Sequence, residues 1–269
     1  MNVRWIVVTL CLGLSACAVS AAPSNSGAII PGLPPGYVPS TDEEAVGYER
    51  AKVHTELGAQ YFAAGQVGVA LDEFNTALAA ERRYVPAHYM LGLVYMELKE
   101  DARAEQYFKS ALDLDNNNSE AHNNYGWFLC QRDHIDASIK QFMAALKNPL
   151  YETPDKPYLN AGICSLKRHD DKGAEEYFLK ALKLSPNQPQ ALLALADIYY
   201  RANDLPNARA QMLTFNRVQN PTAESLWLGV RIEHKLASDK NAEASYGQML
   251  RQRFPLSKEA QALAVGRYE

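Results

Sequence analysis

Residues 92–126 read GLVYMELKEDARAEQYFKSALDLDNNNSEAHNNYG, and the glycines at the two ends stand 34 residues apart. A third glycine, Gly58, lies another 34 residues upstream. Three positions after these glycines come Tyr61, Tyr95 and Leu129. Because self-similarity at a period of this length is typical of stacked supersecondary units, the stretch predicts a repeat architecture with one continuous core.

The repeat resembles the tetratricopeptide repeat, a pair of antiparallel helices in about 34 residues. Six copies can be aligned, of which the fifth and sixth are degenerate. Their members are Leu57, Gly58, Tyr61, Ala70, Phe74 and Ala77; Leu91, Gly92, Tyr95, Ala104, Phe108 and Ala111; Tyr125, Gly126, Leu129, Ser138, Phe142 and Ala145; Gly162, Ala174, Phe178, Ala181 and Pro186; Leu195, Ala196, Tyr199, Ala208 and Met212; and Leu226, Ala242, Tyr246 and Met249. We expect Gly and Ala where two helices approach closely, and the large side chains on one helix face.

The predicted fold class is all-α, because no sustained alternation of apolar and polar residues indicates strands. The resemblance implies a tetratricopeptide-repeat right-handed superhelix over residues 42–269, with about six helix pairs and a C-terminal helix from about Ser257. The acidic run at residues 42–44 reads as a helix start. The spacing from Gly126 to Gly162 is 36 residues, two more than the period, and the excess predicts a longer loop at 148–157.

The N-terminus resembles a bacterial lipoprotein signal. An apolar run at residues 5–14 is too short to span a bilayer, and it is followed by Ser15, Ala16 and Cys17. The resemblance implies a signal peptide at 1–16, lipidation of Cys17, and a flexible lipid-anchored tether at 17–41. Because Ala18 is not aspartate, it also implies the periplasmic face of the outer membrane. The alternative is a secretory signal cut near Ala21 or Ala22.

Charge and motifs favour a binding protein over an enzyme. The net charge is −4, and no basic cluster suited to nucleic acid is visible. The sequence has no phosphate loop, nucleophile elbow or zinc-ligand spacing, so we expect no catalytic residue, cofactor, metal site or small-molecule substrate. His54, His88 and His122 share one repeat position, but helices one repeat apart hold them too far apart to share a zinc ion. We expect partly buried packing positions there.

Cys130 and Cys164 lie 34 residues apart on the first helices of adjacent repeats. In an oxidising compartment, facing helices can bring their Cα atoms within the range that a disulfide needs. We predict a disulfide; the alternative is a pair of buried free thiols that act as small apolar residues.

The segments NNYGWFLC at 123–130, NPLY at 148–151 and NAGIC at 160–164 resemble the type IV pilus biogenesis and stability lipoprotein family. The resemblance covers nearly the whole chain. It implies an outer-membrane adaptor (pilotin) that binds the type IV pilus secretin subunit and promotes its outer-membrane localisation and multimerisation. Its membrane contact is the N-terminal lipid. The alternatives are an adaptor for another envelope machine, such as outer-membrane barrel assembly or peptidoglycan synthesis, and a lipid-anchored enzyme or enzyme activator.

The predicted partner-binding groove lies on the concave face, which the first helices of the repeats line. Its residues are Thr55, Tyr89, Leu93, Met96, Asn123, Trp127, Leu159 and Asn160. They combine apolar anchors with amides that can bond a peptide backbone. Trp127 is a leading member because aromatic anchors dominate interface energetics, and Asn123 is the other because an asparagine that faces a groove can orient a bound chain. Each residue is equally compatible with packing between repeats.

Overall fold

The computed structural model describes residues 41–237 and 239–268, which form thirteen α-helices and contain no strand. The predicted signal peptide, Cys17 and the tether up to residue 40 lie outside these residues. The helices are α1 (Asp42–Ala63), α2 (Val67–Ala80), α3 (Val85–Glu97), α4 (Asp101–Leu114), α5 (Ser119–Gln131), α6 (Ile135–Ala145), α7 (Asp155–Lys167), α8 (Asp171–Leu184), α9 (Pro189–Arg201), α10 (Leu205–Val218), α11 (Ala223–Leu236), α12 (Lys240–Arg253) and α13 (Lys258–Ala264).

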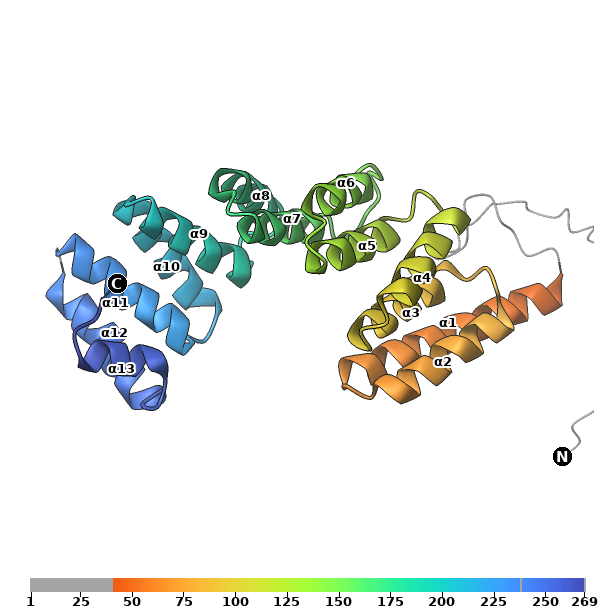
Figure 1. The fold of residues 1–269 in the computed structure, drawn as a ribbon, viewed down its shortest axis with the longest axis horizontal. Helices are drawn as coiled ribbons and strands as arrows, with labels where there is room; N and C mark the ends of the chain where they lie inside the picture. The colour runs from red at the N-terminus through yellow and green to blue at the C-terminus, as the bar shows by residue number, and fades with distance from the viewer. Residues whose placement is uncertain (1–40, 238, 269) are drawn as a thin grey trace, which may run out of the picture.

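Consecutive helices pair, from α1 with α2 to α11 with α12, and α13 packs on the last pair. The pairs follow one another along an arc, with α1 and α2 at one end and α11, α12 and α13 at the other (Figure 1). The prediction of an all-α superhelix of six pairs and a closing helix is confirmed. The start of α1 is also as predicted: Thr41 accepts a hydrogen bond from the Glu44 N–H at 3.2 Å, and three acidic residues occupy the first turn.

Each of the first four pairs is interlocked by one glycine and one phenylalanine. A Cβ added to Gly58, Gly92, Gly126 or Gly162 would lie 2.6–2.7 Å from Cε1 of the phenylalanine sixteen residues later. Those four phenylalanines, at positions 74, 108, 142 and 178, are fully buried. The glycines therefore allow an approach that any side chain would prevent, as the sequence predicts.

The sixth repeat differs from its predicted register. Gly229, which the alignment missed, packs against the Tyr246 ring, and a Cβ there would lie 2.9 Å from Cδ1. Leu250 is fully buried, whereas the predicted Met249 is only partly buried. The separation of Gly229 and Tyr246 is seventeen residues instead of sixteen, and this one-residue shift rotates the following positions of α12 around the helix.

The turn inside each of the first five repeats contains one residue in the left-handed conformation. These residues are Gly65, Lys99, Asp133, His169 and Asn203, with φ between 59° and 75°. Only the first is glycine, so each of the other four turns carries the steric cost of a side chain at positive φ.

Ion pairs join neighbouring repeats at a regular position. A guanidinium at the end of a first helix meets an aspartate at the start of the second helix of the preceding repeat: Arg132 with Asp101, Arg168 with Asp136, and Arg201 with Asp171. The hydrogen bond from Arg132 holds the pKa of the Asp101 carboxyl below its usual range. Exposed pairs of this kind contribute little stability each, and they recur at the same position of three successive junctions between repeats.

Candidate functional site

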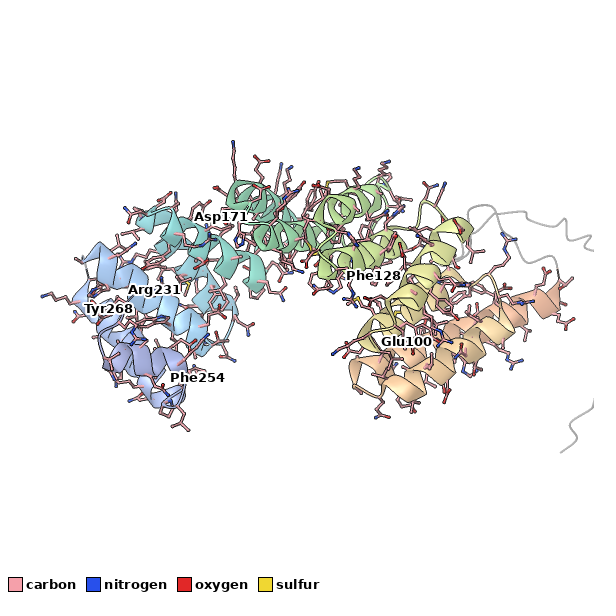
Figure 2. The ribbon with its side chains drawn as sticks, in the orientation of Figure 1. Glu100, Phe128, Asp171, Arg231, Phe254 and Tyr268 are labelled. Atoms are coloured by element: carbon pink, nitrogen blue, oxygen red, sulfur yellow. A yellow bond between two sulfur atoms is a disulfide. The ribbon has the colours of Figure 1, made fainter. Side chains whose placement is uncertain are left out.

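The first helices of the repeats form one row, in which α1, α3, α5, α7, α9 and α11 each contact the next member. In Figure 1, α5 and α7 lie on the inner side of the arc relative to α6 and α8. At these two repeats, a partner held inside the arc therefore meets the side chains of the first helices. Figure 2 marks Phe128 on α5 in the middle of this row, and Arg231 and Tyr268 at its C-terminal end.

Four predicted groove residues form the apolar part of this surface. Tyr89, Leu93 and Met96 recur at offsets of four and three along α3, so they share one face of that helix. All three are partly buried against a core cluster that includes Phe128. Trp127, on α5, is partly buried against the cluster around the two cysteines. These side chains keep exposed apolar surface while their packing limits their motion.

Three of the eight predicted groove residues are buried, namely Thr55, Leu159 and Asn123. Thr55 is 6% exposed, and its hydroxyl donates a 2.7 Å hydrogen bond to the Ala51 carbonyl of its own helix. Leu159 is also 6% exposed and belongs to the core cluster formed by α7, α8 and α9. The Thr55 and Leu159 side chains are both used in packing, and they leave little surface for a partner.

The two predicted asparagines bond to each other. The Asn160 Nδ2 donates to the Asn123 Oδ1 at 3.1 Å, which joins α7 to α5. Asn123 is 5% exposed, whereas Asn160 is partly exposed. Asn123 therefore positions Asn160, and Asn160 is the amide that a peptide backbone can reach.

Cys130 and Cys164 form a disulfide between the same two helices, with a Cα–Cα distance of 5.8 Å. Both cysteines are fully buried. Lys167 reinforces the junction, since its Nζ donates to the Cys130 carbonyl at 2.9 Å. The α5–α7 junction thus carries a covalent bond and two side-chain hydrogen bonds, which fix the relative orientation of Trp127 and Asn160.

The irregular loop between α6 and α7 packs beside the first helices. The Tyr151 hydroxyl is buried near Glu120 of α5, and the Thr153 hydroxyl donates to Glu120 at 3.4 Å. Burial raises the pKa of Tyr89, and the nearby Glu120 and Tyr151 raise it further. The sequence predicts the length of this loop but not its place next to Tyr89, because two extra residues do not say where a loop folds.

The three histidines of the shared repeat position have separate partners. His54 Nδ1 lies 2.6 Å from Glu73, His88 Nε2 lies 2.9 Å from the Arg82 carbonyl oxygen, and His122 Nδ1 lies 2.6 Å from Gln141. In residues 41–237 and 239–268, no three His, Cys, Asp or Glu side chains are placed to hold a metal ion. Over the same residues, no helix combines the length and apolar character needed to cross a bilayer.

Comparison with known proteins gives the family. The tetratricopeptide repeat family matches residues 55–119 and 159–214. The type IV pilus assembly protein PilF of Pseudomonas aeruginosa is 29% identical over 231 residues, which are 84% of this chain and 91% of PilF. The crystal structure of PilW, a widely conserved type IV pilus biogenesis factor, is 31% identical with a TM-score of 0.70, and the match covers 80% of this chain and 98% of PilW.

The chain belongs to the tetratricopeptide repeat family of PilF and PilW. The solved structure of Pseudomonas aeruginosa PilF shares the fold, with a TM-score of 0.75 over 82% of this chain and 99% of that one. Tetratricopeptide repeats are all-helical scaffolds typical of proteins that bind other proteins. The inner row of first helices is therefore the candidate binding surface. The homologues PilF and PilW of this chain are type IV pilus biogenesis factors.

Proposed function

We propose that this protein is an outer-membrane lipoprotein that binds the secretin subunit of the type IV pilus and promotes secretin localisation and multimerisation. The observation that carries the proposal is the match along nearly the full lengths of PilF and PilW, two type IV pilus proteins. The N-terminal sequence supports the membrane part: Ser15 and Ala16 precede Cys17, as in a lipoprotein signal, and Ala18 follows it.

The secretin segment binds along α3, α5 and α7. Tyr89, Leu93, Met96 and Trp127 supply apolar contacts, and Asn160 supplies an amide that can bond the main chain of the segment. Met96 adapts its shape to the ligand, whereas Trp127 is a rigid anchor. Because the disulfide and the Asn123–Asn160 bond hold α5 and α7 together, little ordering of this surface is needed on binding.

The lipid keeps the binding surface at the membrane. Acyl chains on Cys17 contribute about 0.8 kcal/mol for each buried methylene, and two or more chains suffice for stable anchoring. A secretin subunit held by the arc is thereby confined to the membrane surface, where subunits meet at a raised effective concentration. This confinement is the physical basis of the proposed effect on multimerisation.

Deletion of the gene in its host tests the proposal. We expect loss of surface pili and of heat-resistant secretin multimers, with full restoration by the wild-type gene. A Cys17→Ser gene should restore neither in full, and its product should leave the outer-membrane fraction. Normal pili and normal multimers in the deletion strain refute the proposal. If those two are normal while outer-membrane barrel proteins or peptidoglycan are defective, the protein serves another envelope machine instead.

A further inference from the structure

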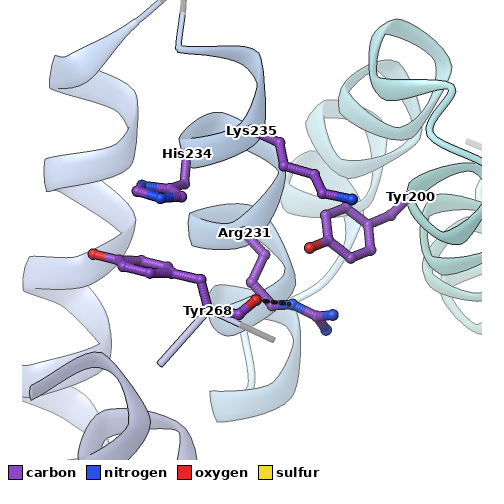
Figure 3. A pocket seen from close by; sticks show the side chains of 5 residues that line it. All are labelled: Tyr200, Arg231, His234, Lys235 and Tyr268. Atoms are coloured by element: carbon purple, nitrogen blue, oxygen red, sulfur yellow. Dashed lines mark hydrogen bonds between the residues drawn. The ribbon is translucent and has the colours of Figure 1, made fainter. Parts of the chain in front are cut away.

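A cavity of about 350 Å³ lies at the C-terminal end of the row of first helices. Tyr200 from the end of α9, three residues of α11 and Tyr268 after α13 line it (Figure 3). The α11 residues are Arg231, His234 and Lys235, whose offsets of three and four place them on one face of that helix. The sequence did not single out any of these five residues.

The segment after α13 is fixed against α11 as one wall of the cavity. The Tyr268 ring stacks on His234 with centroids 3.8 Å apart and planes within 3°, and it also stacks on Trp227 at 5.8 Å. The Arg231 Nε donates to the Tyr268 carbonyl at 3.2 Å. These contacts give the cavity a wall held by stacking and hydrogen bonding.

Two positively charged side chains lie at the opposite wall of the cavity, over the Tyr200 ring. The Arg231 Cζ lies 4.4 Å and the Lys235 Nζ 4.5 Å from the centre of the Tyr200 ring. Figure 3 shows the Lys235 side chain extended toward that ring, and the Arg231 side chain beside its hydrogen bond to Tyr268. Because like charges four residues apart on a helix repel, the arrangement favours an anion close to both.

No carboxylate in the described part of the chain neutralises these cations. Across residues 41–237 and 239–268, no Asp or Glu oxygen lies within 4.0 Å of a side-chain nitrogen of Arg231 or Lys235. The neighbouring acids have other partners: Glu233 pairs with Arg209, and Glu243 pairs with His234, which itself lines the cavity. Within the described part of the chain, the two cations of the cavity therefore have no acidic partner of their own, although the net charge of the chain is −4.

We propose that this cavity binds a carboxylate side chain of an acidic peptide segment from a partner protein. A guanidinium and an ammonium beside one hollow match a carboxylate, and the Tyr200 and Tyr268 rings suit the flanking apolar atoms. The volume is at the lower end for ligand pockets, which fits one or two side chains better than a large glycan. Because α9 and α11 continue the row that contains α3, α5 and α7, a polypeptide lying along that row reaches this cavity. The site is independent of which partner protein supplies the segment.

A peptide selection followed by affinity measurement tests the site. Random twelve-residue peptides are selected on the immobilised full-length protein, and a selected peptide is then synthesised with a fluorescent label and an amidated C-terminus. We expect selected sequences rich in Asp and Glu, and loss of binding when these are replaced by Asn and Gln. Arg231→Gln and Lys235→Gln should each weaken binding about tenfold, and raised salt should weaken it further. Lys240→Gln, an exposed lysine of α12 in the same repeat, is the matched control and should leave binding unchanged.

Several outcomes overturn the inference. Selected peptides without acidic residues, unchanged affinity in both cavity variants, or an equal loss in Lys240→Gln each contradict a specific carboxylate site. Binding to phosphatidylglycerol vesicles that depends on Arg231 and Lys235, without binding of acidic peptides, assigns the cavity to lipid and refutes a peptide ligand. Lys235 is exposed, and its Nζ lies over the Tyr200 ring, so Lys235→Gln tests the site if Arg231→Gln fails to fold.

Discussion

Gly126→Ala tests the interlocking of each helix pair most sharply. The added methyl would lie 2.7 Å from Cε1 and 2.8 Å from Cδ1 of the buried Phe142 ring, and 3.1 Å from the Ser138 carbonyl oxygen. Ordinary carbon contacts are about 3.5–4.0 Å, so the ring and the α6 backbone must both move. Overpacking of this kind costs about 1–3 kcal/mol, and the higher helix propensity of alanine offsets about 1 kcal/mol of that cost. We expect a net loss of about 1 kcal/mol, and at most about 2 kcal/mol, in the free energy of unfolding.

Gly68→Ala is the matched control, because Gly68 also lies in a helix but has no atom within 4 Å of an added Cβ. There the propensity of alanine acts alone, so the variant should be slightly more stable than the wild type. Urea unfolding followed by circular dichroism measures both variants. If Gly126→Ala is as stable as the wild type or more stable, the close approach of helix and ring does not determine the fold.

Three further predictions concern stability. Replacing both Cys130 and Cys164 by alanine should lower the free energy of unfolding by about 4 kcal/mol, because their disulfide closes a loop with a sequence separation of 34; unchanged urea unfolding contradicts this. Burial, together with the Glu105 hydrogen bond, raises the pKa of Tyr125 to about 12, above its unfolded value near 10. The contribution of the protonated Tyr125 to the free energy of unfolding should be fully present below pH 10 and lost as the pH rises through about 12. A spectroscopic titration in which Tyr125 ionises near pH 10 refutes this prediction. Arg209→Ala leaves the 3% exposed Glu233 unpaired, so its melting curve should show a loss of about 3 kcal/mol or more, and a loss under 1 kcal/mol rules the pairing out.

Most of the fold can be predicted from the repeat period, because each position of the repeat meets the same packing requirement in every copy. The contact between Gly92 and Phe108 has a counterpart in each of the first four helix pairs, always with the phenylalanine sixteen residues after the glycine. One clear copy of the repeat therefore identifies the others. In the sixth pair, which was predicted, the alignment missed Gly229, because this glycine meets a tyrosine after seventeen residues instead of sixteen and a pattern with fixed offsets cannot detect that shift. The left-handed turns were missed for a similar reason, since only Gly65 among them is glycine.

The binding surface is harder to predict from the sequence than the fold. The repeat position correctly places Tyr89 and Trp127 on first helices, but it cannot say how much of each residue the next repeat covers. Thr55 and Leu159 share the repeat position of Tyr89 and are nevertheless buried. The cavity at Arg231 depends on α13 and the segment after it, which fold back on α11 outside the repeat period.

The central claim is that the inner row of first helices holds the secretin, and the direct measurement is the affinity of purified secretin subunit for two variants. Trp127→Ala should weaken binding about 30-fold, corresponding to a loss of about 2 kcal/mol at an interface anchor, without loss of helicity. Tyr177→Ala, a partly buried aromatic on the second helix α8, should bind secretin like the wild type. Wild-type affinity in Trp127→Ala, or an equal loss in Tyr177→Ala, contradicts the account.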